Sequence, residues 1–65
     1  MKPECKLIGA NGNVFNLIAI VKKTLRDEGL ESELKLFHEE LLTLIDDGGK
    51  YDDVLTLLSK FVEVV

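Results

Sequence analysis

All five glycines of this 65-residue chain fall in three places, which divide the chain into four apolar segments. The three places are residues 9–13, Gly29 and residues 46–50. Glycine interrupts helices and strands because it adopts backbone conformations that other residues avoid. The sequence therefore predicts short elements joined by tight turns, within a single small domain that spans residues 1–65.

The first two apolar segments predict a strand followed by a helix. Residues 5–9 are short, apolar and stopped by glycine, and Pro3 stands where proline can begin or flank an edge strand. Asn13 is the predicted N-cap of the helix, since its side-chain oxygen can accept a hydrogen bond from a free N–H of the first turn. Gly29 ends this helix as a left-handed residue after the last turn. The apolar face of the helix comprises Val14, Leu17, Ile18, Val21 and Leu25.

Two more helices are predicted, one on each side of the break at residues 46–50. The second helix begins at Leu30 or Glu31 and ends at Ile45, and the third begins near Tyr51. The apolar stripe of the second helix comprises Leu34, Phe37, Leu41, Leu44 and Ile45. The stripe of the third helix comprises Tyr51, Val54, Leu55, Leu58, Phe61 and Val62.

The C-terminal residues 61–65 are β-branched and partly alternating, so they fit either a strand or the last turn of the third helix. A lone strand at residues 5–9 would leave its backbone N–H and C=O groups unpaired. We therefore expect residues 61–65 to pair with it. The predicted fold class is α+β, in the order β-α-α-α-β, with a two-stranded sheet formed by the chain's two ends. The alternative is an all-α three-helix bundle.

The apolar content is generous for so small an interior. Leucine, isoleucine, valine and phenylalanine number 25, yet a domain of this size buries only about 60% of the surface that its unfolded chain exposes. Leu36 and Leu42 lie off the stripe of the second helix, and Phe15 and Ile20 widen the stripe of the first. Because monomers rarely expose large apolar patches, these four residues are the predicted interface of a homodimer.

Charge and cysteine content limit the partners and the compartment. The net charge is −4 and no lysine or arginine cluster is present, which argues against direct binding to nucleic acid or to an anionic membrane surface. The single cysteine, Cys5, cannot form an internal disulfide. The apolar stretch at residues 14–21 is far shorter than the roughly 20 residues of a membrane span. We expect a soluble, cytoplasmic protein.

Few residues suggest chemistry. Residues 9–12 form a G-x-x-G between a predicted strand and helix, and the backbone there could hold an anion at Gly12 and Asn13. The motif lacks the pattern of a dinucleotide fingerprint or a P-loop, so a structural turn is the preferred interpretation. His38 has no second histidine one turn away, and the four aspartates around Gly48 lack the spacing of a calcium loop. The sequence predicts no catalytic residue, metal or cofactor, and hence no enzyme.

Two motifs stand at the ends of the chain. The first is Lys6-Leu7-Ile8-Gly9, followed by Gly12-Asn13, Phe15 and Leu17-Ile18, and the second is Tyr51-Asp52 with Phe61-Val62-Glu63-Val64. Together they resemble a widespread family of small uncharacterised proteins of bacteria and of phage-like or plasmid-like elements. The resemblance implies that strand, turn and terminal Val-Glu-Val form one unit, but it implies no activity. The middle, residues 30–47, is longer than the family's usual connection, and Ala19 stands where glycine is expected.

Three functional hypotheses follow. The leading one is a non-enzymatic protein-interaction module that forms a homodimer. The alternative is an inhibitor encoded on a mobile element, whose acidic surface blocks a host nucleic-acid-binding or defence protein. The third is a domain that binds a small anionic ligand at residues 9–13.

Overall fold

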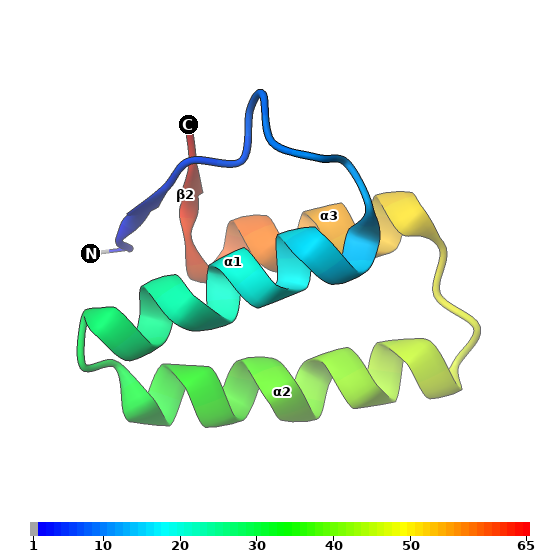
Figure 1. Cartoon of the computed structure of the whole chain (residues 1–65). Coiled ribbons are helices and arrows are strands. Elements are labelled where there is room, and N and C mark those ends of the chain that lie inside the picture. The colour runs from blue at the N-terminus through cyan, green and yellow to red at the C-terminus, as the bar shows by residue number, and fades with distance from the viewer. Residues whose placement is uncertain (1) are drawn as a thin grey trace.

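Three helices and a two-stranded sheet make up the computed structural model of this protein, which describes residues 2–65 (Figure 1). In chain order the elements are β1 (Glu4–Cys5), α1 (Val14–Asp27), α2 (Glu31–Asp46), α3 (Tyr51–Phe61) and β2 (Glu63–Val64). The predicted α+β fold, β-α-α-α-β, is confirmed. The all-α alternative is wrong because the C-terminal segment leaves α3 and pairs with the N-terminal strand.

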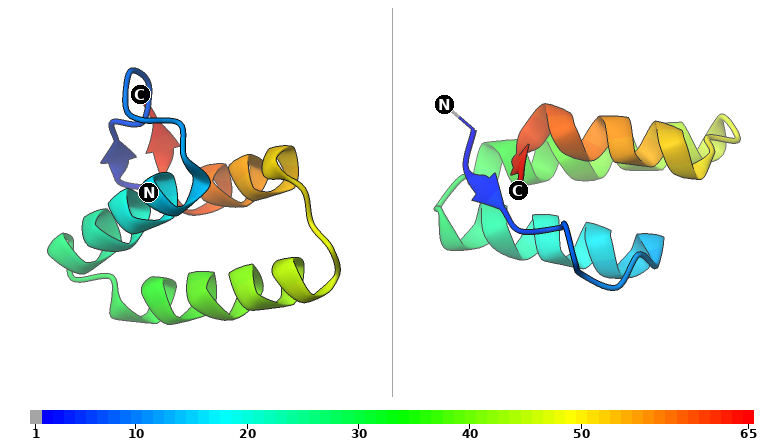
Figure 2. Two further views of the ribbon diagram at one scale, coloured as in Figure 1. Left: turned by 45° about the vertical axis from the view of Figure 1, so that its right-hand side comes forward. Right: turned by 90° about the horizontal axis from the view of Figure 1, so that it is seen from above.

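Each helix packs against the other two around one core. α1 and α3 lie side by side and run in the same direction, whereas α2 runs the opposite way beneath them (Figures 1 and 2). The two strands lie on the other side of α1 and α3, away from α2. One face of α2 therefore closes the core, and its two flanks border α1 and α3.

Local contacts explain where α1 begins and ends. The Asn13 side chain accepts a hydrogen bond from the Phe15 N–H at 2.9 Å, so the predicted N-cap is confirmed. At the other end Gly29 has a φ of +72°, and the Leu30 N–H donates to the Leu25 carbonyl at 2.9 Å. This is a Schellman motif, which needs a left-handed residue after the last turn.

Two glycines end α2 by the same motif, each for its own reason. Gly48 has a φ of +79°, and the Gly49 N–H donates to the Leu44 carbonyl at 2.9 Å. A Cβ on Gly49 would lie 2.6 Å from Leu44 Cγ and 2.8 Å from the Leu44 carbonyl oxygen. Gly48 thus adopts the left-handed conformation that the turn needs, and Gly49 leaves room for Leu44 where a Cβ would clash. The predicted break at residues 46–50 is confirmed.

The two strands are parallel and shorter than the predicted ranges, residues 5–9 and 61–65. Glu4 pairs with Glu63, and Cys5 pairs with Val64. Backbone hydrogen bonds continue beyond this ladder, because the Val65 carbonyl accepts from both Leu7 and Ile8 at 3.0 Å. The regular pairing ends here, because the Val65 carbonyl accepts from two successive N–H groups. The chain then turns at Gly9, which has a φ of +89°.

Side chains from β1, the loop after it, the three helices and Val62 fill the core. At its centre the Phe37 and Phe61 rings meet edge-on, with their centroids 5.3 Å apart. Cys5 and Val62 are buried as well, and they join the strands to the helices. The buried residues are Cys5, Leu7, Leu17, Ile18, Val21, Leu25, Phe37, Leu41, Val54, Leu57, Leu58, Phe61 and Val62.

The prediction that Ile45 and Tyr51 belong to the buried apolar stripes is wrong. Ile45 is 54% exposed, because neighbouring helix residues point about 100° apart and Leu44 takes the inward direction. Tyr51 is also exposed, and its hydroxyl donates to the Gly12 carbonyl at 2.7 Å. Leu57, which the predicted stripe of the third helix omits, is buried on the α2 side of α3.

Candidate interaction site

A polar contact fixes which faces of α1 and α2 lie together. Lys22 Nζ lies 3.3 Å from His38 Nδ1. The two helices are antiparallel, so moving toward the same end of the pair means going back along α1 and forward along α2. Seven residues before Lys22 is Phe15, and seven residues after His38 is Ile45. Seven residues are close to two full turns, so both residues keep nearly the facing directions of Lys22 and His38. Phe15 and Ile45 therefore lie at the same end of the helix pair, each on the flank of its helix that continues from Lys22 or His38.

Three large apolar side chains are exposed at this end of α1 and α2. Phe15 is 75% exposed, Ile45 is 54% exposed, and Leu42, one turn before Ile45, is 53% exposed. We call these three residues the α1–α2 patch. Fully burying side chains of this size contributes about 1.5–3 kcal/mol each, so a partner that covered the patch would gain substantially. The other end of the same face is charged, with Lys22, Arg26 and Lys35 beside the carboxylates of Glu31 and Glu39.

The structure separates the four residues predicted as an interface. Phe15 and Leu42 belong to the α1–α2 patch. Leu36, which is 46% exposed, lies about 120° around α2 from Leu42, on the flank that borders α3. Ile20 is partly buried and packs against the core. The exposed isoleucine of the patch is Ile45, whereas the sequence predicted Ile20. No pattern in the sequence marks Ile45 as exposed.

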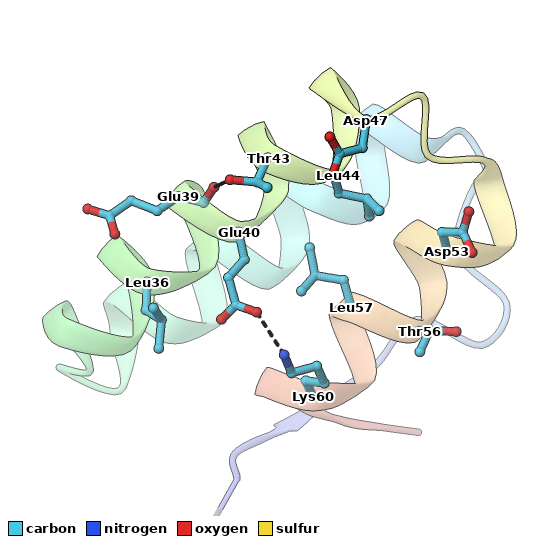
Figure 3. A pocket seen from close by; sticks show the side chains of 10 residues that line it. All are labelled: Leu36, Glu39, Glu40, Thr43, Leu44, Asp47, Asp53, Thr56, Leu57 and Lys60. Carbon is cyan, nitrogen blue, oxygen red and sulfur yellow. Dashed lines mark hydrogen bonds and ion pairs between the residues drawn. The ribbon is translucent and has the colours of Figure 1, made fainter.

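A second feature is an open groove of about 570 Å³ between α2 and α3 (Figure 3). We call it the α2–α3 groove. Its apolar floor is made by Leu36, Leu44 and Leu57. Its polar lining comprises Glu39, Glu40, Thr43, Asp47, Asp53, Thr56 and Lys60. Four of these side chains are carboxylates and one is an ammonium group, so the groove is acidic.

One ion pair crosses the α2–α3 groove. Lys60 Nζ on α3 lies 2.7 Å from Glu40 Oε1 on α2 (Figure 3). Both side chains are accessible to water, and such pairs contribute about 0–1 kcal/mol to stability. Within residues 2–65, Glu39 and Asp47 make no ion pair. The Lys60–Glu40 ion pair therefore stabilises the groove only weakly, and most of the negative charge of the groove stays unbalanced.

The loop at residues 9–13 uses its polar groups within the chain. Gly12 accepts the Tyr51 hydroxyl at its carbonyl, and the Asn13 N–H donates to Asn11 Oδ1 at 3.0 Å. The Asn16 side chain donates to the Asn11 carbonyl at 3.0 Å. Together with the cap at Asn13, these bonds give every residue named here a structural role. Anion binding at Gly12 and Asn13 stays a prediction.

The remaining chemical candidates lie apart from one another. Among residues 2–65, no group of three or more histidine, cysteine, aspartate and glutamate side chains could hold a metal ion. Asp53 accepts the Lys50 N–H at 3.0 Å and so stabilises the start of α3. Cys5 is buried, and the Thr24 hydroxyl donates to its sulfur at 3.3 Å. None of the helices in this part of the chain combines the length and apolar character needed to cross a bilayer.

The fold and these surfaces define a small α+β protein with an apolar patch on one flank of α2 and an acidic groove on the other. No protein-family model, curated protein or solved structure matches the chain. The resemblance to small proteins of bacteria and mobile elements stays a prediction. Its function is therefore inferred from the two surfaces.

Proposed function

We propose that this chain is a non-enzymatic protein-interaction module that forms a homodimer through the α1–α2 patch. The observation that carries the proposal is the exposure of Phe15, Leu42 and Ile45 at the same end of two helices that pack against each other. A phenylalanine exposed by three quarters of its surface adds nothing to the core. Its burial against a second copy would recover hydrophobic free energy that the monomer lacks.

The charges on the same face favour a particular arrangement of the two copies. The end opposite the α1–α2 patch is charged: it carries Lys22, Arg26 and Lys35 together with Glu31 and Glu39. If two copies met in parallel along the whole face, these charged side chains would lose their contact with water, which is costly. A two-fold axis that is perpendicular to the helices and passes through the patch instead stacks the apolar ends and leaves the charged ends in water. The proposed dimer is of this second kind.

Sedimentation velocity of the parent and two variants tests the dimer. Phe15→Ser removes the largest side chain of the patch, and Ile8→Ser is the matched control, because Ile8 is 70% exposed but lies outside the patch. We expect the parent and Ile8→Ser to sediment as dimers and Phe15→Ser as a monomer. A monomeric parent at high concentration, or dissociation by Ile8→Ser alone, would contradict the proposal.

A second candidate function, the inhibitor from a mobile element, has support in the α2–α3 groove. Its unbalanced carboxylates offer an acidic surface to the basic site of a nucleic-acid-binding or defence protein. Genomic neighbourhood tests this function, since the inhibitor requires prophage or plasmid genes beside this one, whereas housekeeping neighbours count against it. A cytoplasmic location belongs to both proposals and is supported by Cys5, a buried free thiol.

A further inference from the structure

We infer that the α2–α3 groove binds a basic amphipathic helix of another protein. This inference deepens the proposed role as an interaction module, but it rests on a surface separate from the α1–α2 patch. Two helices form its walls, leucines form its floor, and its rim is acidic. Grooves of this kind receive the apolar face of a partner helix, with residues spaced three and four apart.

The length of the groove suits a short helix. Along α2 the lining runs from Leu36 through Glu40 and Thr43 to Asp47, one stripe at helical spacing. These eleven steps span about 16 Å at 1.5 Å per residue, or three turns. A partner helix of similar length would place two or three apolar side chains over the floor. Leu36, at one end and nearly half exposed, is the natural contact for the first of them.

The charge of the groove selects a cationic partner. Glu39 and Asp47 carry no ion pair within residues 2–65, and Glu40 is held only by the accessible bridge to Lys60. Opening that bridge costs little, and it frees a carboxylate near the floor for a lysine or arginine of the partner. Complementary charge at the rim steers association and fixes orientation. Nucleic acid would be repelled by the same carboxylates.

A designed peptide tests the inference. The probe is a fluorescent helical peptide with leucines at i, i+4 and i+7, lysines on both flanks and alanine elsewhere. One control peptide carries glutamate in place of lysine, and a second has the same composition with its leucines spread around the helix. We expect the parent chain to bind the probe, more weakly as salt rises, and to bind neither control.

Paired variants locate the binding site. The double variant Glu40→Gln with Asp47→Asn removes two carboxylates of the groove, whereas Glu28→Gln with Asp46→Asn removes two exposed carboxylates outside it. The first pair should weaken binding about tenfold, as expected for two lost charge contacts, and the second pair should leave it unchanged. Glu40 is partly buried and the other three side chains are exposed, so urea unfolding of each double variant checks that the fold is retained.

The outcomes separate this inference from the dimer. Amide signals of Leu44, Leu57 and Lys60 should shift on peptide addition, while those of Phe15 and Leu42 stay. The monomeric Phe15→Ser variant should bind the peptide as tightly as the parent. No binding by the parent, equal weakening in both double variants, or shifts confined to the α1–α2 patch would overturn the inference. Dissociation of the dimer by Glu40→Gln with Asp47→Asn would also overturn it, because the occupant would then be a second copy.

Discussion

Replacing Gly49 with alanine tests the physical account of the turn between α2 and α3. The new Cβ would lie 2.8 Å from the Leu44 carbonyl oxygen, which already accepts the Gly49 N–H at 2.9 Å. Because that oxygen is part of the backbone, relief of the clash requires the turn to open and the hydrogen bond to lengthen. Overpacking costs about 1–3 kcal/mol, and a weakened hydrogen bond adds about 0.5–1.5 kcal/mol. We expect a loss of about 2–4 kcal/mol.

Such a loss is a large part of the total stability, which is about 3–10 kcal/mol for a chain of this length. Urea unfolding followed by circular dichroism measures it, and the midpoint should fall by about 2 M. Gly12→Ala is the control, since a Cβ there meets only the Tyr51 hydroxyl at an ordinary 3.6 Å. If Gly49→Ala were as stable as Gly12→Ala, the conclusion that a Cβ at position 49 does not fit against Leu44 would be refuted.

Three further substitutions test the cap, the core and the loop by the same unfolding measurement. Asn13→Ala removes the N-cap of α1 and should cost about 1 kcal/mol; no change would mean that the cap is dispensable. Phe37→Ala leaves a cavity beside Phe61 and should cost about 3–5 kcal/mol, so the midpoint should fall steeply or the cooperative transition disappear; a parent-like midpoint would contradict the central place given to this ring. Tyr51→Phe removes the bond to Gly12 and should cost about 0.5–1.5 kcal/mol, near the lower value because the tyrosine is exposed; a loss above about 2 kcal/mol would show that the loop depends on more than this bond.

The elements were predictable where short-range chemistry decides them. Asn13 caps α1 through its neighbour Phe15, and Gly29 ends the same helix because the next turn needs a left-handed residue. Both requirements lie within five residues of sequence. The strand pairing followed from a different argument, the need of backbone groups for partners. The need for partners identifies the two paired segments, but the parallel direction and the exact register depend on where the three helices place the chain ends.

The exposed surface was harder to predict, because α2 is apolar on most of its circumference. Leu36, Leu42 and Ile45 differ little in type from Leu41 and Leu44. Only the position of α2 against two neighbouring helices decides which of them turn inward. The spacing alone placed Ile45 inside and grouped Leu36 with Leu42. Small rotations of a helix with a broad apolar stripe change exposure without changing its sequence pattern.

The broad apolar stripe of α2 extends onto both flanks of the helix, so the two proposed surfaces do not overlap. Leu42 belongs to the flank of α2 beside α1, and Leu36 belongs to the flank beside α3. A dimer formed through the α1–α2 patch would therefore leave the α2–α3 groove of each copy open. Such a dimer would present two acidic grooves, so a partner with two basic helices could engage both and gain avidity without any new contact. The apolar excess of α2 would then serve three surfaces at once: the core, the dimer and the groove.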